Sequence, residues 1–460
     1  MSKHARLAAG HNNIPRSSRS RNYVAMTMLF AAALIAVGLS YWGVSAANEG
    51  EGEKMAVQDA ANEGDFVVAF MDSPSGSILR FNIRAGGFSA DSSKRFPEIG
   101  VSGTADDGPQ LTPDIAAAGN GDFVIVWADD ADGNKFYQIH ARGFHSDGSQ
   151  LFPTMTVNTE AKGMQTAPVI AMTPNGDFVV TWQDDMDGND VYQIHARGFN
   201  SDGSQRFPTM TVNSDAAGDQ SAPAIAMALN GDFVVTWQND RSLDGLYNIF
   251  ARGFNSDGSP RFSTKTVNTT LTGDQLYPDI AMAPNGEFVI TWQDDTDLNG
   301  ANQIHARGFT RSGQQRIAPF TVNSVASGDQ TTPYIAMADN GDFVVTWTDD
   351  QDKNGVDQVM ARGFKNDGSP KFPDFFVNSV ANGNQFVTDI AMSGNGDFVI
   401  PWQDDQDGNN VYQILARGFN SDGSERFPDF TVNEKAAGQQ WIPAVAVVRK
   451  GPTVYLPFVK

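Results

Sequence analysis

A block of about 55 residues recurs from one end of the chain to the other. A glycine that precedes each Phe-Val-Val-like segment marks it, with a first spacing of 57 residues and six further spacings of 55. A glutamine and an arginine within the block keep the same step. A fixed period of this length indicates a repeat architecture, in which copies of one small unit stack on each other. The marker glycines are Gly64, Gly121, Gly176, Gly231, Gly286, Gly341, Gly396 and Gly451.

Each block has the pattern of four short strands, A to D. Asn230-Gly231 is a tight-turn signal between the first two strands, an acidic loop follows the second, and Ser256-Asp257-Gly258 is a further turn. We therefore expect every strand to pair with its sequence neighbour in a four-stranded meander. In one block the expected strands are Ala224–Met227, Phe233–Trp237, Tyr247–Phe254 and Thr264–Asn268.

A lone sheet with two apolar faces cannot bury both, so the units must pack face to face. Four-stranded units in this number predict an all-β fold, a β-propeller, with strand A nearest the central channel because it is rich in alanine. The preferred arrangement is seven blades, with the C-terminal hairpin (Val454–Leu456 and the strand before it) closing the first. Eight blades, the last incomplete and counting a weak strand A near Val57, is the alternative, followed by an open solenoid.

The N-terminus differs from the repeats. Residues 1–22 are basic and polar, Tyr23–Val44 is apolar, and Val44-Ser45-Ala46 resembles a cleavage site. We expect residues 1–46 to be a signal peptide or an uncleaved signal anchor with a hydrophobic helix, residues 47–54 a linker, and residues 55–460 the propeller. The predicted location is outside the cytoplasm, at the cell surface, in the periplasm or in the medium. A buried soluble helix is the less favoured alternative.

Charge and cysteine content exclude several function classes. The net charge is −22, and because residues 1–46 carry five basic and no acidic residues, the remainder carries −22 − 5 = −27. Such a surface repels nucleic acid and anionic lipid. We therefore expect no nucleic-acid partner, and a membrane contact only through an uncleaved N-terminal segment. The chain has no cysteine, which excludes disulfides and thiolate chemistry.

The motif GDFVVTWQ…DG…ARGF…DG…F-TVN…GDQ…P-IA spans about Val57–Phe458. It resembles a tandem repeat that is common in large secreted or surface proteins of bacteria. The resemblance implies β-propeller or β-rich adhesive and scaffold modules, and it implies no particular reaction.

The loop between strands B and C carries oxygen side chains at alternate positions, three, five and seven residues after a tryptophan. Such a pattern can hold calcium, as in the first half of an EF-hand loop, but Ala196 and its equivalents stand where the bidentate Glu would be. Asp, Asn and Gly are also the residues that a hairpin loop needs for its turns, so the alternative interpretation is a purely structural role. The candidate calcium ligands are Asp130, Asp132, Asn134, Asp185, Asp187, Asn189, Asp295, Asp297, Asn299, Asp350, Asp352, Asn354, Asp405, Asp407 and Asn409.

Other repeated residues favour structural roles. The arginine of strand C (Arg197 and its equivalents) is expected to bond a carbonyl or Asp of its own or the next blade, with anion capture as the alternative. The tryptophan that ends strand B (Trp182 and its equivalents) is expected to pack between blades, with sugar stacking as the alternative. The glutamine before strand A is expected to cap backbone groups. The histidines have no metal-ligand spacing.

Near-identical blades supply many equivalent weak sites, whereas catalysis needs one unique set of groups. The sequence therefore favours a non-catalytic module for binding, adhesion or scaffolding. Its expected partner is a surface protein or glycan, and calcium is the one candidate cofactor. A propeller hydrolase or lyase acting on polysaccharide is the alternative, and a purely structural envelope repeat is the third. The binding hypothesis expects small residues along the channel, and the enzyme hypothesis expects carboxylates from different blades to converge there. An enzyme is expected to draw on the irregular stretches: Met55–Phe96, Arg241–Leu243, Thr310–Ser312 or the C-terminus.

Overall fold

The computed structural model describes residues 61–73, 80–102, 108–130, 132–189, 191–243, 245–387 and 389–450, all within the compact unit Met55–Lys460. The expected hydrophobic helix at 23–44, the linker at 47–54, the weak strand near Val57 and the hairpin strand at 454–456 lie outside these residues. Where the chain is described, no helix combines the length and the apolarity needed to cross a bilayer.

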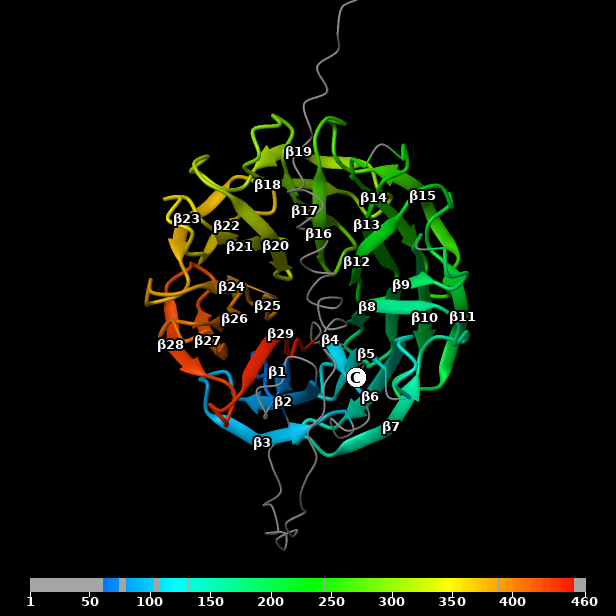
Figure 1. Cartoon of the computed structure of the whole chain (residues 1–460), viewed down its shortest axis with the longest axis horizontal. Coiled ribbons are helices and arrows are strands. Elements are labelled where there is room, and N and C mark those ends of the chain that lie inside the picture. The colour runs from blue at the N-terminus through cyan, green and yellow to red at the C-terminus, as the bar shows by residue number, and fades with distance from the viewer. Residues whose placement is uncertain are drawn as a thin grey trace, which may run out of the picture. The chain divides into compact units, whose positions relative to one another are not determined.

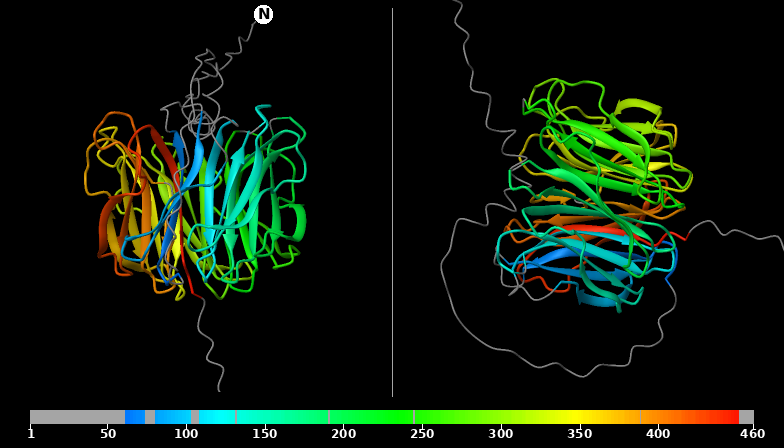
Figure 2. Two further views of the ribbon diagram at one scale, coloured as in Figure 1. Left: turned by 90° about the horizontal axis from the view of Figure 1, so that it is seen from below. Right: turned by 90° about the vertical axis from the view of Figure 1, so that its right-hand side faces the viewer.

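Seven four-stranded antiparallel sheets surround a central axis as the blades of a propeller (Figure 1). Figure 2 shows the ring from two sides, with the blades upright around it and their turns on the two end faces. The expected meander is confirmed in blades 2 to 7, and the expected seven-bladed ring is confirmed over eight blades or a solenoid.

The strands follow here from the innermost to the outermost of each blade. Blade 1 has β29 (Gln439–Val447), β1 (Phe66–Ser73), β2 (Asn82–Phe88) and β3 (Lys94–Gly100). Blade 2 has β4 (Gln110–Ala117), β5 (Phe123–Asp129), β6 (Gln138–Phe144) and β7 (Gln150–Thr156). Blade 3 has β8 (Met164–Met172), β9 (Phe178–Asp185), β10 (Gln193–Phe199) and β11 (Gln205–Thr211). Blade 4 has β12 (Gln220–Met227), β13 (Phe233–Asn239), β14 (Asn248–Phe254) and β15 (Pro260–Thr266).

Blade 5 has β16 (Gln275–Met282), β17 (Phe288–Asp294), β18 (Gln303–Phe309) and β19 (Gln315–Thr321). Blade 6 has β20 (Gln330–Met337), β21 (Phe343–Asp349), β22 (Gln358–Phe364) and β23 (Pro370–Phe376). Blade 7 has a divided innermost strand, β24 (Gln385–Val387) and β25 (Ala391–Met392), then β26 (Phe398–Asp404), β27 (Gln413–Phe419) and β28 (Glu425–Thr431).

The ring closes between the two ends of the repeat region. Strand β29 pairs with β1 from Phe66↔Val447 to Ser73↔Gln439, so the last described strand becomes the innermost strand of the first blade. This confirms that the C-terminus closes blade 1, with a copy of strand A as the closing element. Closure pairs the inner edge of β1, which would otherwise have no partner strand.

Strand D begins earlier than the sequence pattern indicated. We expected Thr264–Asn268 in blade 4, and the structure has Pro260–Thr266. The reason is the tight turn before it, where Gly258 has φ +83° and donates its N–H to the carbonyl of Asn255, so pairing resumes at once.

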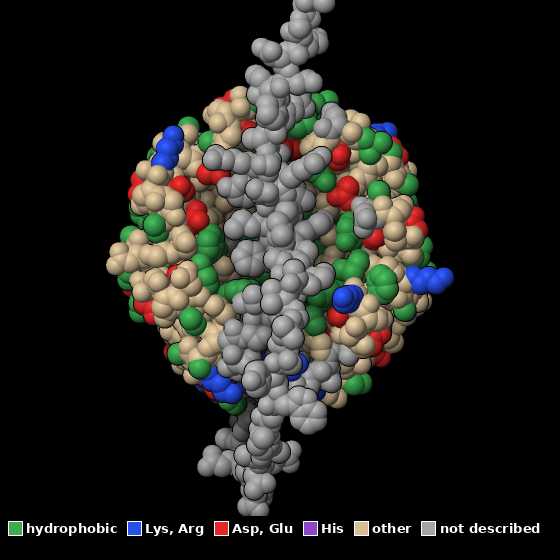
Figure 3. All heavy atoms as spheres, viewed as in Figure 1, with side chains coloured by type: hydrophobic (Ala, Val, Ile, Leu, Met, Phe, Trp, Pro, Cys, Tyr) green, Lys and Arg blue, Asp and Glu red, His purple; other side chains and the backbone are tan. Residues whose placement is uncertain are grey.

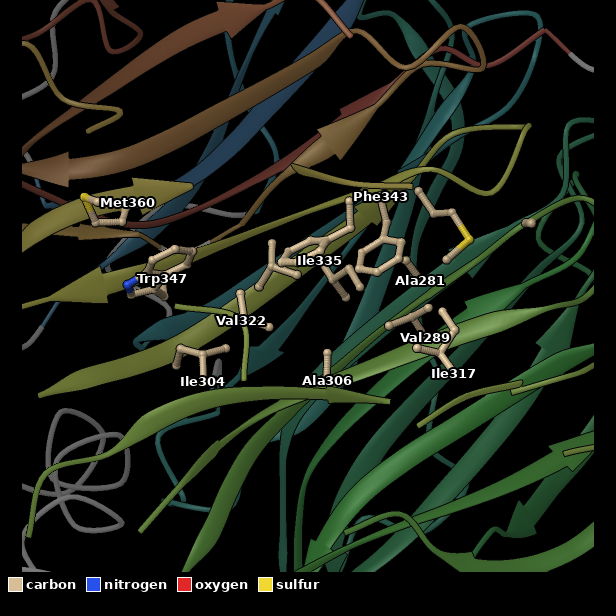
Figure 4. Packing of buried hydrophobic residues seen from close by; sticks show 14 residues of the cluster. Ala281, Val289, Ile304, Ala306, Ile317, Val322, Ile335, Phe343, Trp347 and Met360 are labelled. Carbon is tan, nitrogen blue, oxygen red and sulfur yellow. The ribbon is translucent and has the colours of Figure 1, made fainter. Parts of the chain in front are cut away.

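The core lies between the blades. Each repeat tryptophan is at most 1% exposed, which confirms its expected packing role. In the layer between blades 5 and 6, Val289 and Ile304 of one blade meet Ile335, Phe343 and Trp347 of the next (Figure 4). Face-to-face packing of apolar side chains is therefore what holds the repeats in a ring.

A β-bulge interrupts every complete strand A just before its Pro. In blade 4 the bulge residue Ala222 has a left-handed φ of +50°, and its N–H donates to the Gln183 side chain of blade 3 over 3.1 Å. Tyr277 and Thr332 repeat this bond, to Gln238 and Gln293. The bulge thus fixes how each innermost strand meets the preceding blade, and it sets the side chain that follows the Pro at the channel wall.

Candidate active site in the central channel

One position of the innermost strand distinguishes the blades from each other. It lies one residue beyond the Pro position of strand A, and its seven members are spaced by 55 residues around the channel. Three members are acidic and one is a tyrosine, whereas the other three are small or aliphatic. In blade order from blade 1 they are Ala444, Asp114, Val169, Ala224, Asp279, Tyr334 and Asp389.

Each of the three aspartates reaches the next blade. Asp114 Oδ2 accepts from the Ile170 N–H over 2.7 Å, and Asp279 Oδ2 accepts from the Ile335 N–H over 2.8 Å. Asp389 Oδ2 accepts from the N–H of Val445 over 2.7 Å. These bonds hold the carboxyl groups in defined places on the wall, at the contact between adjacent innermost strands.

The surroundings disfavour ionisation of all three carboxyls. Burial raises the pKa of Asp114 to about 6 and the pKa of Asp279 to about 7, against the pull of their backbone hydrogen bonds. Burial, with repulsion from Asp114 and Asp279, raises the pKa of Asp389 well above its ordinary value. Among the described residues, no ion pair involves any of these three carboxyls. Repulsion between like charges without a compensating cation therefore couples the three carboxyls.

The open channel and the surrounding protein have opposite effects on the hydration of these three carboxyls. Each side chain is partly accessible because it borders the channel. Protein atoms nevertheless surround it and displace most of the water that would stabilise a charge, so the pKa rises.

Tyr334 completes this cluster, which we call the channel cluster (Asp114, Asp279, Tyr334 and Asp389). Burial raises the pKa of its phenol, and the charges of Asp389, Asp279 and Asp114 add to the effect. The phenol is therefore neutral at physiological pH and can donate a hydrogen bond.

The channel cluster was not predicted from the sequence. Strand A was expected to be uniformly small and apolar, and a possible enzyme site was expected in the irregular stretches. The usable signal was local: the copies are close to identical, yet one position changes between Ala, Val, Tyr and Asp. Only the ring brings these positions together, because they are spread over blades 2, 5, 6 and 7.

The acidic loops between strands B and C lie apart from this cluster, in blades 2 to 7. In blade 3, Asp185 Oδ1 accepts from the Asn189 N–H over 2.9 Å, and Asn189 Nδ2 donates to Asp187 Oδ2 over 2.8 Å. The loops at Asp132, Asp297, Asp352 and Asp407 have the same Asn-to-Asp bond. Within the described ranges, no three His, Asp or Glu side chains gather as a metal site would require. Calcium binding by these loops stays a prediction.

The repeated arginine and glutamine have the structural roles that we expected. Arg197 Nη1 donates to the Val157 carbonyl of the preceding blade over 2.7 Å, and its guanidinium lies 5.2 Å from the centre of the Phe199 ring. The other five equivalents make the same bond between blades. Gln165 donates to the Lys162 carbonyl over 2.7 Å in the link between blades.

Three histidines of strand C lie beside the core tryptophans. His195 Nδ1 is 3.1 Å from Asp184 Oδ2, which also accepts from Trp182 Nε1 over 3.2 Å. His140 and His305 face Asp129 and Asp294 in the same way. They belong to separate blades and do not meet the channel cluster.

No family model and no curated protein matches this sequence. Among solved structures, the chain is similar to an alpha-L-arabinanase from Penicillium chrysogenum, with a TM-score of 0.46, 12% identity, and coverage of 64% of this chain and 88% of that one. It is also similar to the alpha-L-arabinofuranosidase Arb93A from Fusarium graminearum (TM-score 0.45, 12% identity, 67% and 92% covered). A third is an intramolecular trans-sialidase from Ruminococcus gnavus (TM-score 0.44, 9% identity, 70% and 96% covered). At these identities the likeness is one of fold.

The channel cluster corrects the function that the sequence favoured. A non-catalytic binding, adhesion or scaffold module was expected to have a channel lined by repeated small residues. The channel wall does have small or aliphatic residues at Ala444, Val169 and Ala224, but it also has carboxyls from three blades. The polysaccharide-acting alternative therefore replaces the binding module as the preferred interpretation.

Proposed function

We propose that this chain is a propeller hydrolase that acts on a polysaccharide or oligosaccharide in its central channel. One observation supports the proposal: Asp114, Asp279 and Asp389 come from three blades to one level of the channel, with their pKa values raised to different extents. Hydrolysis of a glycosidic bond needs one carboxylic acid and one carboxylate on opposite sides of the bond. Environments that separate the pKa values of neighbouring carboxyls supply such a pair.

The roles follow from the protonation states at neutral pH. Burial and the charges of Asp114 and Asp279 raise the pKa of Asp389 well above its ordinary value, which favours the protonated form and suits this group to protonate the leaving oxygen. Asp114, with a pKa of about 6, is mostly ionised at pH 7 and serves as the carboxylate partner. Asp279 titrates near neutrality and is the second carboxylate as the pH rises.

The remaining wall positions are uncharged. Ala224, Ala444 and Val169 occupy the equivalent places in their blades. Tyr334, neutral and between Asp279 and Asp389 in blade order, can donate a hydrogen bond to a sugar hydroxyl.

The test is release of reducing ends from a panel of neutral and acidic polysaccharides by the full chain. We expect Asp389→Asn and Asp114→Asn each to lower kcat by about 10²-fold or more, the usual size of a general acid–base contribution. Asn retains an oxygen that can accept the Val445 or Ile170 N–H, so the blades stay connected. The control is Asp202→Asn in an exposed turn, which removes the same charge far from the channel and leaves kcat unchanged.

Two results would contradict the proposal. One is a folded wild-type chain that releases no reducing ends from any polysaccharide of the panel. The other is activity that survives in the Asp114→Asn, Asp279→Asn and Asp389→Asn variants.

A further inference from the structure

Blade 4 has a polar pocket that is separate from the channel. Its volume is about 150 Å³, the space of about five waters in the liquid, and it lies beside the outer half of the blade at the end of β13. Its lining includes Asp215 from the preceding link and Trp237, Asn239, Arg241, Phe250 and Thr264 from blade 4. We call it the blade 4 pocket.

Two substitutions within the repeat make this blade different. The position of Asn239 is Asp in all six other blades, and in five of them that Asp accepts a hydrogen bond from the tryptophan two residues earlier. The position of Phe250 is His in blades 2, 3 and 5, where the imidazole lies against the same Asp. Blade 4 has therefore lost both the charge and its partner.

The loss leaves one buried acceptor without a donor. The amide nitrogen of Gln220 donates to the carbonyls of Asp215 and Ala217, so its oxygen must accept from Trp237 Nε1 over 2.9 Å and from Asn239 Nδ2 over 2.8 Å. This arrangement fixes the Asn239 amide, because the reverse orientation would set two oxygens against each other. Asn239 is 3% exposed, and its Oδ1 has no hydrogen-bond partner among the described residues.

A buried amide oxygen at the wall of a pocket is satisfied when a bound molecule donates to it. The other side chains that line the pocket indicate which class of molecule could bind there. Arg241 Nη2 and Asp215 Oδ2 form an ion pair of 2.9 Å, so the pocket has no net charge. Thr264 and Ser214 add hydroxyls 3.0 Å apart, and Phe250 adds an aromatic surface.

Paired charges, several donors and acceptors, and one aromatic ring match a neutral polyhydroxylated ring better than an ion. We propose that the blade 4 pocket binds one neutral sugar residue, with a hydroxyl of the sugar donating to Asn239 Oδ1. The site is distinct from the channel cluster and does not depend on the activity proposed for it.

The test uses saturation-transfer NMR on the full chain with the methyl glycosides of glucose, galactose, mannose and xylose, followed by titration of the best one. The Asn239→Asp/Phe250→His variant rebuilds the arrangement of Asp184 and His195 in blade 3, and we expect at least a tenfold loss of affinity. Arg241→Gln alters only a mostly exposed side chain, so folding is retained, and we expect a loss of several-fold. The channel variant Asp279→Asn should bind as the wild type does.

Each other outcome overturns the proposal. Absence of transfer from all four glycosides would do so, as would equal binding by Asn239→Asp/Phe250→His. Inorganic phosphate that binds the pocket in preference to the glycosides would replace the neutral sugar with an anion. A signal lost in Asp279→Asn and kept in Arg241→Gln would move the binding to the channel.

Discussion

Replacing Asp279 with Asn should make the protein more stable at neutral pH, although the residue belongs to the proposed site. Burial raises the pKa of this carboxyl from 3.8 to about 7, so the native state binds its proton more tightly than the unfolded chain does. The wild type therefore has its full stability below about pH 4, where both states are protonated, and loses stability as the pH rises from there to about 7. Because Asn has no charge at any pH, the variant does not lose stability in this way.

The size of the effect follows from the same two values. The difference between 3.8 and about 7 is about 3 pH units. At about 1.4 kcal/mol for each unit, the limit is about 4 kcal/mol of unfolding free energy. The measured gain should be smaller, because Asp279 is partly exposed to the channel and solvent screens its charge. The Asn oxygen can still accept the N–H of Ile335, so little else changes.

The assay is urea unfolding of wild type and Asp279→Asn at intervals from pH 4.5 to 8.5. We expect the difference in unfolding free energy, variant minus wild type, to grow up to about pH 7 and then to level off. Asp202→Asn is the control with the opposite sign, because hydrogen bonds from Ser204 lower the pKa of that exposed carboxyl. A difference that is flat across this range, or that falls with pH, would refute the account of the channel carboxyls.

Further expectations concern the site, the repeat and the loops. The hydrolytic rate should fall below about pH 6 as Asp114 takes up a proton, a limb that pH–rate measurements would locate and that Asp114→Asn should abolish. Gly198→Ala should lower unfolding free energy by about 1–3 kcal/mol, because an added Cβ would lie 2.2 Å from the Phe207 ring, and Phe207→Leu should relieve part of the loss in urea titrations. Arg197→Met should cost about 1–3 kcal/mol by leaving the Val157 carbonyl without its donor, a loss that calorimetry would detect. The calcium hypothesis predicts a lower Tm after chelation, and an unchanged Tm would reject calcium in the Asp185–Asn189 loop and its equivalents.

The fold could be predicted from the sequence because every repeat carries the same strand and turn signals. The turn at Asn230-Gly231, the alternating strand Phe233–Trp237 and the period of 55 residues predict four strands and seven blades without any long-range knowledge. Packing of Trp237 follows from the same regularity.

The channel cluster could not be predicted in the same way. Asp114, Asp279 and Asp389 are far apart in the chain, and their importance depends on the closure of the ring. The repeat drew attention to what the copies share, such as the acidic loops, whereas the candidate chemistry lies at a position where they differ. Asn239 and Phe250 follow the same rule, since a change within a repeat is the signal for a blade-specific site.

The pairing of β29 with β1 has a consequence for biosynthesis. Strands β1, β2 and β3 are made before the other blades, but the innermost partner of their sheet leaves the ribosome only after the strands of the six other blades. Blade 1 must therefore wait with an unpaired edge at β1. On the end face drawn in Figure 3, acidic side chains lie among hydrophobic and other ones around the ring. Premature termination before β29 should therefore lower the folding stability by more than the contacts of one strand, because β1 then has no inner partner in its own chain.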